Sequence, residues 1–151
     1  MTLLMTPSVR VATAADAQYC HELERQAQGD SAGARGAAAF FAEQPIGFIG
    51  DGNGGFTVIA EVDEVAVGFA TVHISSVAGT NVATVVRVFV TARARRVGVG
   101  DALINAAKQK AREANCARID ALSLPGDRDT KNLYERNGLT ARLIVATSVL
   151  D

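Results

Sequence analysis

The period of the hydrophobic pattern changes several times along this 151-residue chain, and each change predicts a new element. The middle of the chain is rich in β-branched residues that alternate with other residue types, which is typical of strands. After it, apolar residues recur at helical spacing from Val99 to about Ala114. The pattern predicts strands at 9–13, 56–62, 65–76, 82–90, 118–124 and 139–150, and helices at 14–28, 36–43, 99–114 and 127–137. This order predicts an α/β fold, a mixed sheet with helices on its faces.

Short polar turns separate the predicted strands. Asp63-Glu64 lies between two alternating runs and indicates a hairpin, and residues 78–81 give a second turn signal. The segment 29–55 is different, because it holds eight of the chain's 14 glycines. Glycine frees the backbone, so we expect this segment to be the most mobile part of the chain. An irregular connection on the surface is the alternative interpretation.

Length and composition favour one domain that spans residues 1–151. Apolar residues make up 48% and charged residues 21%, as in a soluble globular protein. Fifteen basic and 16 acidic residues leave a formal net charge of −1, which argues against a nucleic-acid binder. Cys20 and Cys116 cannot form a disulfide framework, and no cysteine or histidine has zinc-ligand spacing, so no metal is predicted. The start lacks signal-peptide features and the apolar runs are too short to span a membrane, which favours a cytoplasmic protein.

Residues 87–101 carry the most informative chemistry. They contain four arginines and no acid before Asp101, and they lead through Gly98 and Gly100 into a predicted helix. Basic side chains, glycines and the free N–H groups of a helix start together favour an anion such as a phosphate or pyrophosphate. A solvated basic loop is the alternative. A Walker-type loop would need Lys-Ser/Thr where Asp101-Ala102 stands, and a dinucleotide fingerprint would need a small residue at Leu103.

Two motifs in this part of the chain resemble one family. Arg95-x-x-Gly98-x-Gly100 is similar to the acetyl-CoA signature of the GNAT superfamily of N-acetyltransferases. About 36 residues later, counted from Gly98 to Tyr134, the run 133–139 is similar to the second signature of that superfamily, a short helix that carries a tyrosine. The resemblance covers the C-terminal two-thirds well, whereas the first 55 residues match only in the order of elements. It implies a mostly antiparallel GNAT sheet and transfer of an acetyl group from acetyl-CoA directly to an amine.

The resemblance also implies roles for particular residues. The main-chain N–H groups of the glycine loop would hold the pyrophosphate, and Arg95 and Arg96 would add positive charge. The loop residues are Arg95, Arg96, Val97, Gly98, Val99, Gly100 and Asp101. The pantetheine arm would lie along the preceding strand at Val88, Phe89 and Val90, whose side chains are better explained by core packing. Tyr134 would be the general acid that protonates the departing thiolate, although it could instead pack beside Leu133.

The sequence departs from the family pattern in two places. Asp127 stands where the family often has a cofactor-binding asparagine, and it is better explained as a helix N-cap. The strand before the loop has Val85-Val86-Arg87 where many relatives have a carboxylate, so the general base is open. The substitutes are Glu22, Glu24, Glu61, Asp63 and His73, and their spacing selects none of them.

The predicted partner is a small-molecule or peptide amine whose identity the sequence leaves open. No nucleic acid and no membrane are predicted as partners, and a homodimer stays open. The alternative function is a non-catalytic acyl-CoA-binding or regulatory module with the same fold.

Overall fold

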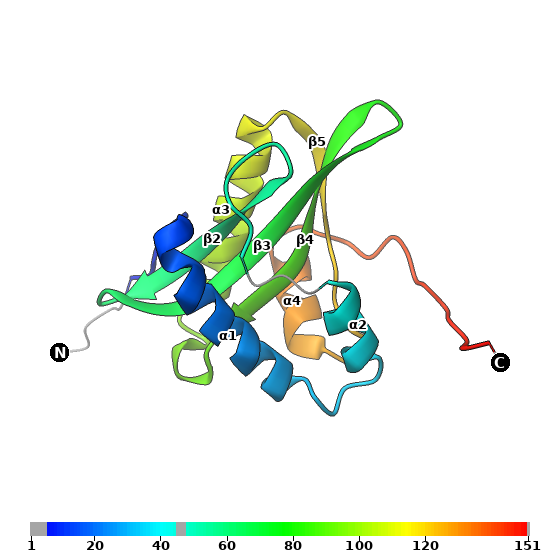
Figure 1. Ribbon diagram of the computed structural model, residues 1–151, viewed down its shortest axis with the longest axis horizontal. Coiled ribbons are helices and arrows are strands. Elements are labelled where there is room, and N and C mark those ends of the chain that lie inside the picture. The colour runs from blue at the N-terminus through cyan, green and yellow to red at the C-terminus, as the bar shows by residue number, and fades with distance from the viewer. Residues whose placement is uncertain (1–5, 45–47, 151) are drawn as a thin grey trace.

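Five strands form the sheet at the centre of the protein (Figure 1). The computed structural model describes residues 6–44 and 48–150. The strands lie in the order β1 (Ser8–Val11), β2 (Gly55–Val62), β3 (Val65–Val77), β4 (Thr80–Val90) and β5 (Cys116–Ala121). β1 to β4 pair antiparallel, and β4 pairs with β5 in parallel. The predicted mixed, mostly antiparallel sheet is confirmed.

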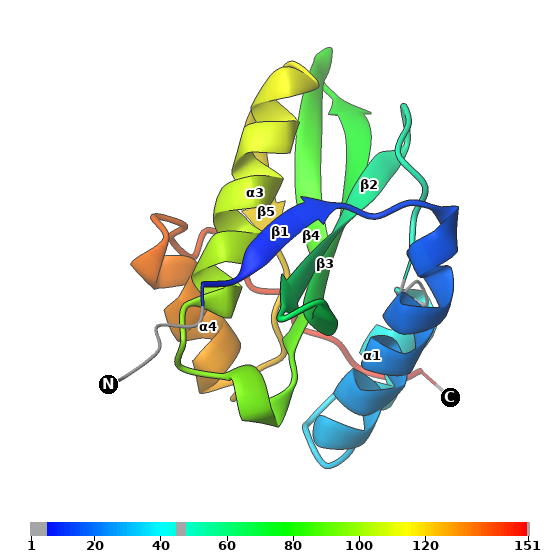
Figure 2. The same ribbon diagram turned by 90° about the vertical axis from the view of Figure 1, so that its left-hand side faces the viewer.

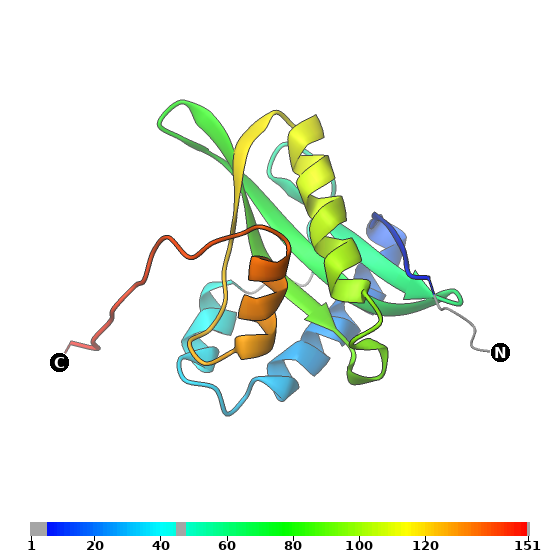
Figure 3. The same cartoon turned by 180° about the vertical axis from the view of Figure 1, so that it is seen from behind.

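Helices cover both faces of this sheet. The helices are α1 (Ala17–Asp30), α2 (Ala37–Glu43), α3 (Val99–Glu113) and α4 (Arg128–Arg136), with single 3-10 turns at Ala14–Asp16 and Ala92–Ala94. α1 and α2 lie on one face and α3 and α4 on the other (Figures 2 and 3). The apolar stripe of α3 packs Leu103 and Ala107 into the main core. Nearly every residue of β2 is buried, because both faces of that strand are covered.

The two predicted turns are tight hairpins. Asp63 and Glu64 have φ values of 50° and 65°, and Ala78 and Gly79 have 50° and 84°. Two consecutive residues at positive φ give a turn whose twist matches that of the flanking strands. Three of these four residues, Asp63, Glu64 and Ala78, are not glycine. The two-residue turn fixes the register of each hairpin.

The prediction of a final strand at 139–150 was wrong. The described residues of this segment form no strand, and the side chains of Leu143, Ile144 and Val145 are largely exposed to solvent. β-branched residues give a segment a high β-propensity, but the segment forms a strand only when it pairs with a neighbouring strand. The strand predicted at 118–124 also differs, since it runs from Cys116 to Ala121, where its pairing with β4 ends.

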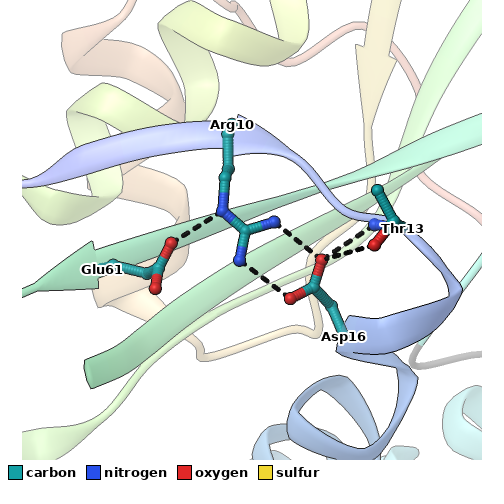
Figure 4. Close-up of polar contacts among 4 residues, drawn as sticks. All are labelled: Arg10, Thr13, Asp16 and Glu61. Atoms are coloured by element: carbon teal, nitrogen blue, oxygen red, sulfur yellow. Dashed lines mark hydrogen bonds and ion pairs between the residues drawn. The ribbon is translucent and has the colours of Figure 1, made fainter. Parts of the chain in front are cut away.

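A buried carboxylate ties the N-terminal strand to the body of the protein (Figure 4). Asp16 is only 4% exposed, and its two oxygens accept from the guanidinium of Arg10 at 2.7 and 2.8 Å. The N–H of Thr13 donates to the same carboxylate, and Arg10 Nε also donates to Glu61 on β2 at 2.7 Å. The hydrogen bonds from Arg10 and Thr13 hold the pKa of Asp16 far below its usual range. The network therefore joins β1, β2 and the start of α1.

We expect Asp16→Asn to lower the free energy of unfolding by about 2 kcal/mol at neutral pH, since a charge-assisted pair with Arg10 is lost. The lowered pKa means that the unfolded chain binds this proton more readily than the folded chain. Stability from Asp16 is therefore complete above the unfolded pKa of about 3.9 and falls as the pH drops through and below it. Urea denaturation at neutral and acidic pH measures both effects.

The control for this experiment is Glu22→Gln, which removes an exposed carboxylate that pairs with Arg25 on the same helix. An exposed pair of this kind contributes little, so that variant should keep the stability and acid sensitivity of the unmodified protein. An Asp16→Asn variant with the acid sensitivity of the unmodified protein would contradict the assignment.

Candidate functional site

The parallel strands β4 and β5 stay paired only as far as Val85 and Ala121. At this point β4 carries a bulge, because Thr71 on β3 pairs with Arg87 and Val72 pairs with Val85. Val86 is the extra residue between them. A bulge bends its strand and increases the local twist. The last half of β4 therefore runs on without a partner on the side of β5.

A cavity of about 1170 Å³ lies where the two strands part. Val86–Val90 line one side, residues 122–127 after β5 line another, and the loop before α3 and the helix α4 complete that part of the wall. The predicted residues that line it are Val88, Phe89, Val90, Arg95, Arg96, Gly98, Val99, Gly100, Asp101 and Tyr134. Val97 does not line the cavity and is 42% exposed. The fold thus brings both sequence motifs to one cavity.

The two glycines of the first motif have different surroundings. Gly98 lies just before α3 with φ +85°, and a Cβ added there would meet no atom within 4 Å. A Cβ on Gly100 would lie 3.0 Å from the side chain of Leu133 on α4. Gly98 therefore leaves open space at the helix start, whereas Gly100 permits α3 and α4 to pack closely. This open space lies beside the N–H groups of the first turn of α3.

Two neighbouring arginines of the loop also differ. Arg95 donates to Asp30 at the end of α1 and to the carbonyl of Val90, each at 2.9 Å, and it lies over the ring of Phe89. These contacts fix the loop against β4. Arg96 lines the same cavity and makes no hydrogen bond or ion pair with the residues that the structure describes. Its φ of 69° is strained for a residue with a side chain, and such strain gathers at functional sites.

Arg87 does not belong to this loop. It lies on β4 directly after the bulge, is 4% exposed, and its Nε donates to Glu24 on α1 at 2.5 and 2.8 Å. Its guanidinium lies 4.4 Å from the ring centre of Phe41 and 5.0 Å from that of Phe40, and it donates to the carbonyl of Gln44. The sequence analysis placed Arg87 in the basic loop, because no motif near Arg87 indicates that its partner is a glutamate 63 residues away.

Tyr134 lies on α4 and packs with Ile104 and Leu133. Its side chain lines the cavity, and its hydroxyl donates to the carbonyl of Leu122 at 2.8 Å. Burial raises the pKa of this phenol well above its usual range, and the charge of Asp127 raises it further. The phenol is therefore protonated at neutral pH.

Two carboxylates that line the cavity accept hydrogen bonds from α4 and its C-terminal end. Asp127 accepts from the N–H of Thr130 at 3.1 Å and from its hydroxyl at 2.7 Å, which confirms the predicted N-cap of α4. Asp101 accepts from Asn137 at 2.7 Å and from Arg136 at 3.0 Å, so the start of α3 is bound to the end of α4. Burial alone would raise the pKa of Asp101, but these two hydrogen bonds outweigh it and lower the pKa.

The five candidate bases lie elsewhere in the described structure. Glu24 is bound to Arg87, Glu61 to Arg10 and Glu22 to Arg25. The five candidates are Glu22, Glu24, Glu61, Asp63 and His73. None of them is among the described residues that line the cavity. The cysteines are no better as nucleophiles, since neither is among the described residues that line the cavity and burial raises the pKa of both thiols, that of Cys20 to about 11.

Comparison with known proteins decides the family. The model of the acetyltransferase (GNAT) family matches residues 17–139. The chain belongs to this family. Membership confirms the identification made from the two motifs and makes the protein an acetyl-CoA-dependent acetyltransferase. No curated protein matches the chain.

Solved structures share the fold of this acetyltransferase at low identity. Aminoglycoside N-acetyltransferase AAC(6')-Iy in complex with CoA is 21% identical, with a TM-score of 0.70 and 95% of each chain covered. Ribosomal-protein-alanine N-acetyltransferase from Brucella melitensis biovar Abortus 2308 is 19% identical, with a TM-score of 0.71 and coverage of 97% of this chain and 99% of that one. A transcriptional regulator from Bacillus halodurans C-125 is 22% identical, with a TM-score of 0.71 and coverage of 96% and 100%.

No helix within residues 6–44 and 48–150 is long and apolar enough to cross a membrane.

We expect Glu24→Ala to lower the free energy of unfolding by about 3–5 kcal/mol, because it leaves the buried guanidinium of Arg87 without its counter-ion. Chemical denaturation measures the loss. The double variant Glu24→Leu with Arg87→Met should lose less, since it removes both charges together. Glu22→Ala is the matched control, as it breaks an exposed pair two residues away on the same helix. Equal losses for Glu24→Ala and Glu22→Ala would contradict the role of the buried pair.

Proposed function

We propose that this acetyltransferase moves the acetyl group of acetyl-CoA directly to an amine, and that the whole chain acts as one catalytic domain. One observation carries the proposal. The parting of β4 and β5 brings the open helix start at Gly98 and the side chain of Tyr134 to the walls of one cavity. Bound acetyl-CoA would supply an activated thioester, and the protein's own groups would hold it, orient it and assist the leaving sulfur.

The residues that would hold the donor act mainly through their main chain. The N–H groups around Gly98 and in the first turn of α3 would bind the diphosphate, and Arg96 would add its charge. The side chains of Val88 and Val90 pack against the core. Their main-chain groups lie on the part of β4 beyond the bulge, where an extended pantetheine could pair as a strand would.

Tyr134 would assist the departure of the sulfur. A tyrosine phenol is protonated at neutral pH and burial raises its pKa further, so a donor is present when negative charge develops on sulfur. A phenol this weakly acidic stabilises that charge by donating a hydrogen bond, because full proton transfer to a thiolate would be uphill. The hydroxyl now donates to the carbonyl of Leu122 and would have to turn from it or share its proton.

The acceptor would enter beside α2. Phe40, Phe41 and the exposed Arg35 line that part of the cavity, together with the buried Arg87. None of the five candidate bases is among the described residues that line the cavity, so we propose that the amine loses its proton to water. The similar solved structures carry the names of different acceptors, an aminoglycoside and a ribosomal-protein alanine, and the class of amine therefore stays open.

We expect Gly98→Val to raise the Kd for CoA at least tenfold, because the new side chain would fill the space that a diphosphate needs. Calorimetry with CoA measures the change. Gly79→Val is a matched control, since Gly79 has almost the same φ of +84° and equally open surroundings but lies in the β3–β4 turn. It should suffer the same backbone strain and bind CoA normally. A folded Gly98→Val variant with unchanged affinity would remove this loop from the donor site.

We expect Tyr134→Phe to lower kcat by about 100-fold, because the hydrogen-bond donor to the developing thiolate is lost, while the Kd for CoA changes little. The carbonyl of Leu122 loses its donor, so the free energy of unfolding should fall by about 1 kcal/mol. Thiol release from acetyl-CoA over a panel of amines measures turnover, and Tyr19→Phe, on an exposed tyrosine of α1, is the control. Full turnover in Tyr134→Phe would show that another group or water serves the sulfur.

A further inference from the structure

The loop that joins α1 and α2 forms part of the cavity wall, on the face of the sheet that these two helices cover (Figures 1 and 2). Main-chain hydrogen bonds shape this loop. The N–H of Ser31 donates to the carbonyl of Ala27 at 3.1 Å, and the N–H of Ala34 donates to the carbonyl of Ser31 at 2.9 Å. Gly33 also lines the cavity, and a Cβ there would meet no atom within 4 Å. The loop therefore leaves room for a ligand beside it.

Arg35 carries a positive charge at the end of this loop. It lines the cavity, is exposed, and makes no hydrogen bond or ion pair with residues 6–44 and 48–150. The other two arginines on the side of α1 and α2 are already bound, Arg95 to Asp30 and Arg87 to Glu24. The remaining donors of Arg87 reach main-chain carbonyls. Arg35 is therefore the cation on this side that an anionic group of a ligand can engage.

The acids that line the cavity leave this positive charge unbalanced. On the side of α1, Asp30 already accepts from Arg95 at 2.9 Å. The other acids in the described wall are Asp101, Asp127 and Asp129, at the starts of α3 and α4, which cover the opposite face of the sheet (Figure 3). A polycationic acceptor needs carboxylates to pair with its ammonium groups, whereas an acceptor with a carboxylate needs a cation. The side of the cavity beside α1 and α2 favours the second kind.

Two aromatic rings of α2 add an apolar wall on the same side. The rings of Phe40 and Phe41 meet edge to face with their centres 5.6 Å apart, and the guanidinium of Arg87 lies 5.0 and 4.4 Å from those centres. Both residues are half-buried and line the cavity, so part of each side chain is open to a ligand. An apolar or aromatic group of the acceptor can pack there and remove this surface from water.

We propose that the acceptor is an amino carboxylic acid with an apolar or aromatic group, whose carboxylate is bound by Arg35 and whose apolar group packs against Phe40 and Phe41. A guanidinium can donate to both oxygens of a carboxylate. The proposal rests on the acetyl transfer proposed above and names the class of its acceptor. The amine nitrogen bonds to the acetyl carbon as the bond from that carbon to sulfur breaks. Water takes the proton that the nitrogen loses, and the sulfur leaves with the electron pair and takes up a proton from solvent. The product is an N-acetylated acid that keeps its carboxylate.

The first test compares matched amines on the unmodified protein, with thiol release from acetyl-CoA as the measurement. Phenylalanine and phenethylamine differ in a carboxylate close to the amine, and 4-(aminomethyl)benzoate and benzylamine differ in a distant one. We expect the carboxylate member of at least one pair to have a kcat/KM about tenfold higher than its partner and than the polycation neamine. No preference in either pair, or faster turnover of neamine, would overturn this proposal and leave acetyl transfer standing. Thiol release with none of a broad panel of amines would instead overturn the proposed function, and this proposal with it.

The second test assigns the carboxylate to Arg35. We expect Arg35→Gln to remove most of the preference within the favoured pair, through KM rather than kcat, because the charge that binds the carboxylate is lost. Arg112→Gln is the matched control and should keep the preference, since Arg112 is also exposed but is not among the described residues that line the cavity. Arg96→Gln should raise the Kd for CoA and keep the preference. Calorimetry of the favoured amine with CoA-saturated protein makes the same comparison without turnover. A folded Arg35→Gln variant that keeps the preference, or an equal loss of preference in Arg96→Gln, would overturn the proposal.

Discussion

The parting of β4 from β5 after Val85 is the constraint on which the rest of the site depends. Parallel strands that stayed paired would leave neither a cavity nor a free edge between them. The bulge at Val86 ends the pairing within one residue, and the buried Arg87 follows at once. Because Arg87 is bound to Glu24 on α1 and lies against the aromatic rings of α2, the bent half of β4 is held from the opposite face of the sheet. The opening is thus maintained by packing and charge together.

The arginines around this opening serve different purposes. Arg87 and Arg95 are bound to acids of the same chain, so they stabilise the walls and carry little free charge. Arg96 makes no such contact among the described residues, and its strained backbone holds it in the cavity wall beside Gly98. A near-neutral chain can in this way still present a positive charge where an anion would bind. The net charge of −1 therefore says little about the site itself.

Local signals predicted most of the fold and of the loop. The turns at Asp63-Glu64 and Ala78-Gly79, the stripe of α3 and the N-cap at Asp127 each depend on residues close together in the sequence, and the structure confirms them.

Features that depend on distant pairing could not be predicted from the sequence. The partner of Arg87 is 63 residues away, and the different roles of Gly98 and Gly100 become visible only when Leu133 packs against α3. The strand predicted at 139–150 was wrong for the same reason. Its pattern is that of a strand, but a pattern does not say which sheet edge the strand will bind.

β5 connects the segment after α4 to the residues of the site. It is six residues long and pairs with one strand, so its position depends heavily on what covers its other side. The carbonyl of Leu122, the residue after β5, accepts a hydrogen bond from the hydroxyl of Tyr134, and Asp120 on β5 forms an ion pair with Arg142. The position of β5 therefore sets the position of the Leu122 carbonyl, and this carbonyl orients the phenol of Tyr134 in the cavity wall.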